Sequence, residues 1–163
     1  MLRSKVVLVL ACAVLVACTQ ELTRRERLVQ RDLVEERMDT WVRLLNNAKQ
    51  DSLALMYIQS PELQVMWPEG HRSSGWDQEE QALRDFYANI QYMNFVVSDR
   101  TIQVLTPEIA VSTFAHSTDI VQLNAQRRPV ATGLGTIVWV KDPEDNLWKI
   151  YTEQIARNAP SRN

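Results

Sequence analysis

The strongest constraint on the fold is a change of hydrophobic period about 95 residues into the chain. Before this point the apolar residues recur at helical spacing, and one amphipathic stripe contains Val34, Met38, Trp41, Leu45 and Ala48. After it, residues 95–105, 109–123, 129–141 and 147–156 are rich in Val, Ile, Thr and aromatic side chains, which are typical of strands. Helices followed by a meander of strands predict an α+β domain with one antiparallel sheet covered on one face.

Shorter elements are expected between the first helix, which begins at Leu28, and these strands. Asp51 and Ser52 indicate the start of a short helix over residues 53–57. Residues 62–67 alternate as a strand that turns at Pro68-Glu69-Gly70. A capping-box pattern from Asp77 to Glu80 then predicts a helix that buries Leu83, Phe86, Tyr87 and Ile90.

The N-terminus has the features of a targeting signal. Arg3 and Lys5 precede an apolar run of about twelve residues, which is too short to cross a bilayer and typical of a signal peptide. Leu15-Val16-Ala17-Cys18 resembles the lipobox of bacterial lipoproteins, which implies a lipid (palmitate) anchor on Cys18. The alternative is a plain secretory signal cut after Ala17. Thr19, where inner-membrane retention mainly uses Asp, favours the outer membrane, facing the periplasm.

We therefore divide the chain into a signal peptide (1–17), a lipidated tether (18–27), one domain (28–156) and a polar tail (157–163). Eighteen basic and 20 acidic residues give a net charge of -2, so no basic surface is predicted for nucleic acid. Two Cys and two His are too few for a structural zinc site. Since no phosphate-binding or nucleophile motif is present either, we predict neither metal nor cofactor.

The order of the elements resembles the SnoaL-like branch of the nuclear transport factor 2-like superfamily. The matching features are the first helix with Trp41, the strand and turn 66–70, Gly75 before the next helix, and residues 147–150 in the last strand. The resemblance spans about residues 28–155. It implies a cone (cystatin-like roll) in which a curved sheet wraps around the N-terminal helix, a pocket between helices and sheet, and frequent homodimers through the outer sheet face. Members include isomerases, dehydratases, binders and interaction modules.

Few ionisable groups are expected inside such a cone. His116 shares a strand face with Phe114 and is the best candidate for a general base, although a hydrogen-bonded strand histidine without a chemical role is the more common alternative. His71 is interpreted as a surface histidine in a loop bordering the pocket mouth. Strand alternation places Asp119 and Glu153 on the outer face, in salt bridges or a dimer contact. It also places Thr152 and Gln154 inside, where many relatives have His, which weakens the enzyme interpretation.

Aromatic side chains are the more informative group. The predicted pocket lining consists of Trp41, Trp67, Tyr87, Phe114, His116, Trp139, Trp148 and Thr152. The alternative is that these rings fill the cone. The sequence predicts an envelope lipoprotein that binds a small, largely apolar molecule, and leaves two rivals: an isomerase-like or dehydratase-like enzyme using His116 as base with Tyr87 or Thr152 as hydrogen-bond donor, and a non-catalytic interaction module.

Overall fold

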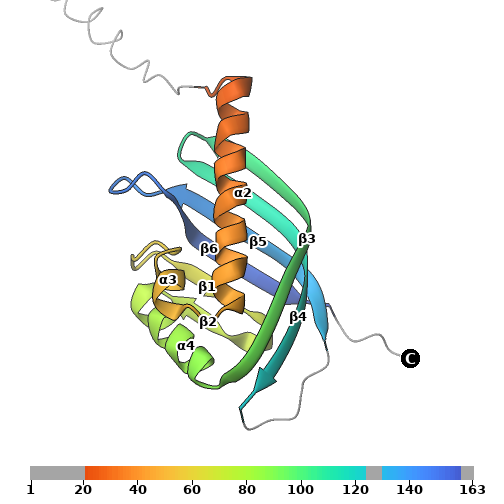
Figure 1. The fold of residues 1–163 in the computed structure, drawn as a ribbon. Coiled ribbons are helices and arrows are strands. Elements are labelled where there is room, and N and C mark those ends of the chain that lie inside the picture. Colours follow the sequence, from red (N-terminus) through yellow and green to blue (C-terminus); the bar gives the residue numbers. More distant parts are fainter. Residues whose placement is uncertain (1–20, 124–129, 159–163) are drawn as a thin grey trace, which may run out of the picture.

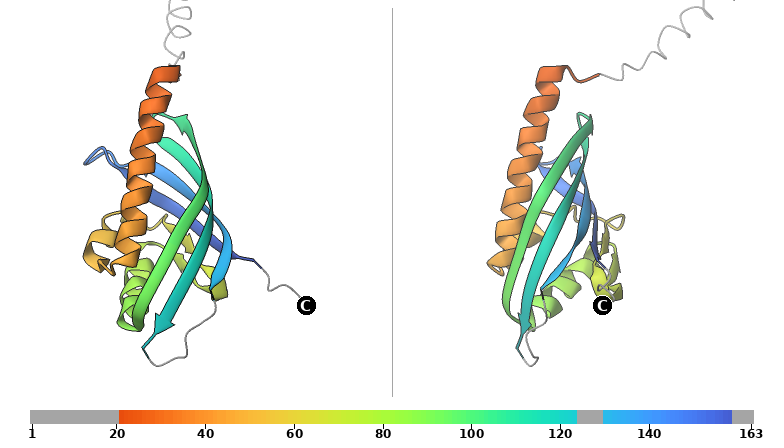
Figure 2. Two further views of the ribbon diagram at one scale, coloured as in Figure 1. Left: turned by 45° about the vertical axis from the view of Figure 1, so that its right-hand side comes forward. Right: turned by 90° about the vertical axis from the view of Figure 1, so that its right-hand side faces the viewer.

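The computed structural model describes residues 21–123 and 130–158, so the predicted signal peptide and Cys18 lie outside the described residues. A long helix, α2 (Arg24–Asn46), lies against one face of a strongly curved six-stranded sheet (Figures 1 and 2). Two shorter helices, α3 (Gln50–Ala54) and α4 (Trp76–Ala88), lie near the C-terminal end of α2. The predicted α+β class and helix-covered sheet are confirmed.

Helix α2 begins four residues before the predicted start. Thr23 accepts a hydrogen bond from the Glu26 backbone N–H, and the Glu26 side chain binds back to Thr23 in a capping box. The last part of the predicted tether, residues 24–27, is therefore helical. The predicted stripe is buried from Val34 to Leu45, but the helix ends at Asn46, and Ala48 has a positive φ of 49° beyond it.

The sheet order is β2-β1-β6-β5-β4-β3. The four long strands form the predicted antiparallel succession: β3 (Ile90–Thr106), β4 (Ile109–Gln122), β5 (Ala131–Lys141) and β6 (Trp148–Arg157). Strand β1 (Gln64–Met66) pairs with β6 in parallel. Strand β2 (Arg72–Ser74) falls in a predicted loop, because its three polar residues carry no hydrophobic alternation.

Helix α4 does not start with the predicted capping box. Its N-cap is Gly75, which has a φ of 90° and makes no side-chain cap, so Asp77 lies inside the first turn. The Gly75 N–H donates to the Leu63 carbonyl at 2.8 Å, which fixes the entry into the helix beside β1. Glycine adopts this left-handed conformation without the steric cost of a Cβ.

One extra residue in β6 reverses the predicted faces of the residues that follow it. Val138 pairs with Thr152 and Trp139 with Ile150, so Tyr151 is a bulge residue without a pairing partner in β5. Alternation before the bulge buries Trp148 and Ile150, and alternation after it buries Glu153 and Ile155. The predicted outward Glu153 is therefore wrong, as is the inward Gln154, which is exposed. Asp119, also expected outside, is only 8% exposed.

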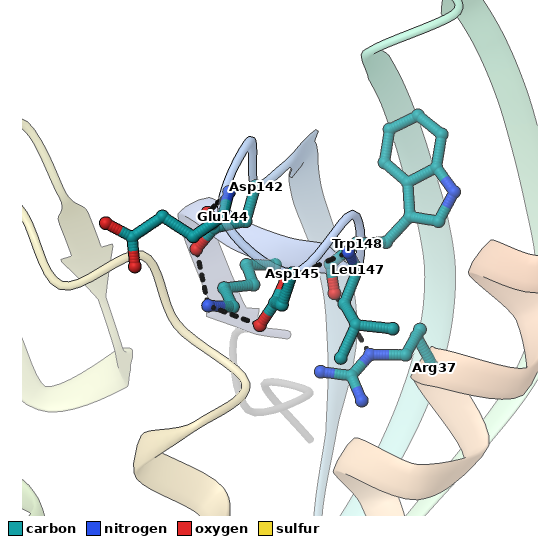
Figure 3. A network of polar contacts seen from close by, with 7 residues as sticks. Arg37, Asp142, Glu144, Asp145, Leu147 and Trp148 are labelled. Atoms are coloured by element: carbon teal, nitrogen blue, oxygen red, sulfur yellow. Dashed lines mark hydrogen bonds and ion pairs between the residues drawn. The ribbon is translucent and has the colours of Figure 1, made fainter.

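The turn between β5 and β6 fixes where β6 begins (Figure 3). Lys149 Nζ pairs with Asp142 and, at 2.9 Å, with Asp145 Oδ2, and both carboxylates also accept backbone hydrogen bonds within the turn. The Lys149 ammonium and the Glu144 backbone N–H lower the pKa of Asp142. Arg37 Nε donates to the Trp148 carbonyl at 3.0 Å, which ties α2 to the first residue of β6.

Candidate functional site

A cavity of about 310 Å³ lies between α4, the 3-10 turn Pro68–Gly70 and the inner faces of β4 and β6. Its lining is mainly apolar: Leu45, Trp67, Pro68, Ala82, Leu83, Phe86, Tyr87, Ile120, Ala131 and Ile155. The polar groups on its wall are His71, Glu79, His116, Thr118, Gln122 and Arg157. An apolar cavity with a few polar groups is the usual form of a small-molecule site.

Three aromatic rings build one wall. The Trp67 and Phe86 centroids lie 6.4 Å apart, and Phe86 meets Tyr87 edge to face at 5.2 Å. The Tyr87 hydroxyl donates to the Leu45 carbonyl at 3.1 Å, which anchors α4 to the end of α2. Burial, together with the charge of Glu153, raises the pKa of Tyr87, so its hydroxyl stays protonated at neutral pH.

Only three of the eight predicted lining residues lie on the cavity wall. Trp67, Tyr87 and His116 line it. The remaining predicted rings are instead fully or almost fully buried in the core: Trp41, Phe114, Trp139 and Trp148. Thr152 is not on the cavity wall, because the bulge at Tyr151 shifts the alternation of β6. The rings therefore fill one part of the cone and leave another part open.

His116 is on the wall, but both of its ring nitrogens bind within the protein. Nε2 lies 3.1 Å from the Ala156 carbonyl oxygen, which can only accept, so Nε2 carries the hydrogen. Nδ1 then accepts from the Thr118 hydroxyl at 3.0 Å. The ring stacks on Phe95 at 5.2 Å. Burial lowers the pKa of His116, which keeps the ring neutral, while its basic lone pair is already occupied.

His71, the second histidine on the cavity wall, lies beside the Glu79 carboxylate. Its Nε2 lies 3.5 Å from Glu79 Oε2 and 3.0 Å from Ser73 Oγ. The Glu79 side chain is 2% exposed, whereas that of His71 is 40% exposed. Within the described part of the chain, no hydrogen bond uses His71 Nδ1. The pair therefore combines a buried carboxylate with an imidazole that reaches both the cavity and solvent.

Glu79 is the site residue that sequence reasoning missed. Burial raises its pKa, and the Ser73 hydroxyl and His71 partly offset that effect. Its Oε2 atom has no hydrogen-bond partner within residues 21–123 and 130–158. The signal was present, because Glu79 precedes Leu83 by four positions and Phe86 by seven, on the apolar stripe of its helix.

A second buried carboxyl group lies in the core next to this site. Glu153 is fully buried, and its Oε2 accepts a 2.7 Å hydrogen bond from the Tyr57 hydroxyl. The Trp41 indole N–H in turn donates to the Tyr57 oxygen at 3.4 Å. Burial, together with the nearby charge of Glu79, raises the pKa of Glu153 to about 8. Glu153 is therefore mainly a neutral acid at pH 7.

The sequence matches no family model and no curated protein. Among solved structures, a candidate scytalone dehydratase from Novosphingobium aromaticivorans superposes with a TM-score of 0.72 at 16% identity, covering 84% of this chain and 89% of that one. A nuclear transport factor 2-like protein from Salmonella enterica gives 0.67 at 21% identity, covering 81% and 93%. This is the nuclear transport factor 2-like fold. A hexachlorocyclohexane dehydrochlorinase with this fold gives 0.71 at 8% identity, covering 84% and 90%.

At these identities the similarity establishes the fold, and the nuclear transport factor 2-like fold hosts more than one kind of function. The scytalone dehydratase and the dehydrochlorinase are named for elimination reactions. Among the described helices, none is both long and apolar enough to span a bilayer.

Proposed function

We propose that the domain binds a small, largely apolar molecule in the cavity and catalyses a proton transfer on it, leading to elimination or isomerisation. The observation that carries this proposal is the His71–Glu79 pair on the wall of an aromatic cavity. A buried carboxylate beside an imidazole fixes the orientation of the ring and stabilises the imidazolium that forms when the ring accepts a proton. This arrangement supplies a general base without a metal or cofactor.

The geometry assigns the two ring nitrogens of His71 different roles. Nε2 faces Glu79 and Ser73, so the proposed mechanism places the hydrogen on Nε2 and makes Nδ1 the basic atom. In an elimination, Nδ1 takes a proton from carbon, the C–H electron pair forms the new double bond, and the imidazolium returns the proton to the departing hydroxyl as water. In an isomerisation the imidazolium returns the proton to a different carbon.

The rest of the cavity supplies binding and orientation. Trp67 and Phe86 offer apolar faces, and a volume of about 310 Å³ suits a molecule of one or two rings. Arg157 and Gln122 line the wall and carry hydrogen-bond donors, so they are the candidates to bind a carbonyl or hydroxyl oxygen of the ligand.

A non-catalytic binder is the second candidate, and the environment of His116 favours it. The one ionisable side chain that β4 contributes to the wall has both nitrogens satisfied, as in a structural histidine. If His71 only closes the mouth of the cavity, the site binds without reacting. The interaction-module hypothesis required a filled cone and is weakened by the open cavity.

Two measurements test the proposed function. Mass spectrometry of small molecules retained by the purified protein identifies the ligand class. Turnover of hydroxylated ketones of one or two rings is then compared between the wild type and the His71→Gln and Glu79→Gln variants, with Glu80→Gln as a matched surface control. A loss of about a hundredfold or more is the range expected on removing a general base. Equal turnover in all four proteins contradicts the assignment, and ligand binding without turnover favours the binder.

The cellular setting is a further part of the proposal. The lipobox-like Leu15-Val16-Ala17-Cys18 supports a lipid anchor in the bacterial envelope, with the outer membrane favoured by Thr19. The ligand would then be a molecule present in the periplasm. A homodimer through the outer sheet face, as the fold resemblance implies, is part of the same proposal.

A further inference from the structure

Glu153 is the most unusual residue that the proposed reaction does not use. Its side chain is fully buried, Oε2 accepts from Tyr57, and Oε1 has no hydrogen-bond partner in the described part of the chain. An unpaired carboxylate in such a position is costly, whereas a neutral carboxyl group is tolerated. The core therefore favours a Glu153 that keeps its proton.

Strand pairing places this acid close to the His71–Glu79 pair. Val65 of β1 lies opposite Glu153 of β6 on one side and opposite Ser73 of β2 on the other. With strands about 4.8 Å apart, the Cα atoms of Ser73 and Glu153 are separated by roughly 10 Å across the same inner face. Ser73 is buried and contacts His71, so the two buried acids lie near one short row of the sheet.

The groups that face Glu153 come from four elements. Tyr57 follows α3 and donates to it, Glu79 and Tyr87 of α4 interact with it electrostatically, and Val65 and Ile137 flank it within the sheet. None of these five residues is cationic. A charge on Glu153 would thus meet the charge of Glu79, and among these five residues only the Tyr57 hydroxyl would stabilise it.

We propose that Glu153 is a positioning residue that holds a proton beneath the His71–Glu79 pair, so that only one of the two buried carboxyl groups is charged while the pair works. The neutral acid leaves Glu79 as the single anion facing His71. When Glu153 ionises, a second negative charge appears behind Glu79 and changes the field at the imidazole. Ionisation of Glu153 thereby sets the upper end of the pH range in which the His71–Glu79 pair works. The working role of the pair rests on the proposed function, but the proton on Glu153 is a property of the ligand-free protein.

The test is an NMR titration of the full chain in detergent micelles between pH 5 and 10. Glutamate Cδ labelling reports the protonation of Glu153, and the His71 ring reports the field at the pair. The chain has two histidines, so a His116→Gln variant assigns the ring signals. We expect a Glu153 inflection near pH 8 and a matching inflection in the His71 ring.

Three variants give distinct outcomes. Glu153→Gln removes the alkaline inflection from the His71 ring. Tyr57→Phe moves it to higher pH, because the Tyr57 hydrogen bond stabilises the carboxylate form. Glu80→Gln, at a half-exposed residue of α4 that pairs with Arg84, leaves it unchanged. A Glu153 that is already ionised at pH 6, or a His71 titration that is identical in Glu153→Gln and the wild type, overturns the proposal. Neither result depends on turnover, so the proposed function fails or stands separately.

Discussion

The Tyr57 hydroxyl donates a 2.7 Å hydrogen bond to Glu153 Oε2 in the core, where neither side chain is more than 1% exposed. A hydrogen bond to the carboxylate lowers the pKa of Glu153, but burial raises it by more, and the balance is a value of about 8 against the ordinary 4.5. The free energy of unfolding therefore depends on whether Glu153 is protonated.

The sign of this dependence follows from the raised pKa. A group that binds its proton more tightly in the folded state stabilises fully below pH 4.5, and this contribution is lost as pH rises to about 8. At about 1.4 kcal/mol per pKa unit, the loss over this window reaches at most about 5 kcal/mol. Thermal unfolding from pH 5 to 9 should show a falling melting temperature in the wild type.

The Glu153→Gln variant isolates this effect. Its melting temperature should fall less steeply over the same range, since only the smaller contribution of Glu79, which has the same sign, remains. The Glu80→Gln control, at a half-exposed carboxylate, should keep the wild-type slope. A wild-type curve that rises from pH 5 to 8 would contradict the buried neutral acid.

Trp41 should be the most costly truncation on α2. It is fully buried, meets Phe95 and Phe114 edge to face at 5.5 and 6.0 Å, and donates to Tyr57. Trp41→Ala should lower the free energy of unfolding by about 3–5 kcal/mol in a denaturant titration. Leu55→Ala, at a residue 63% exposed, is the control and should change it little. Equal midpoints for both variants would place Trp41 outside the core.

Gly133 should not tolerate a side chain. A Cβ there would lie 1.8 Å from the Ala156 carbonyl oxygen and 2.6 Å from His116 Nε2. Gly133→Ala must therefore separate β5 from β6 and break the hydrogen bond between His116 and Ala156, with a cost of about 1–3 kcal/mol. The His116 Nε2–H signal in NMR reports this bond directly. An unchanged signal together with an unchanged melting temperature would refute the close packing.

The sequence was sufficient to predict the element order, because the periods of α2 and of the four long strands follow directly from burial. It was insufficient for the site. The predicted faces of β6 assume a regular strand in which successive side chains point to opposite faces. The bulge at Tyr151 inserts one extra residue, so every later side chain of β6 changes face. Glu79 falls within the capping-box segment from Asp77 to Glu80 and received no role from the sequence, although it shares a stripe with Leu83. Charged residues are usually outside, and functional sites are where that expectation fails.

Cys18 lies outside the described residues, so its lipidation stays a prediction from the lipobox-like Leu15-Val16-Ala17-Cys18. Cys18→Ala should abolish palmitate labelling and block processing of the signal peptide, since the anchor needs a thioether at that position. Cys12→Ala, within the same apolar run, is the matched control and should be labelled like the wild type. Fatty-acid labelling of the Cys18→Ala protein would mean that the assignment is wrong.

Substitutions of the two histidines should have different effects on turnover and on melting temperature. His71→Gln removes the basic Nδ1 at the cavity mouth and should lower turnover of an accepted substrate by about a hundredfold or more, with little change in melting temperature, because His71 is 40% exposed. His116→Gln removes a buried, stacked ring that bonds Ala156 and Thr118, and should lower the melting temperature more than His71→Gln does. If turnover falls about a hundredfold in His116→Gln and stays unchanged in His71→Gln, the base is His116, and Thr118 must turn away from Nδ1 when substrate binds. The melting temperatures and rate constants of the same two proteins decide between these outcomes.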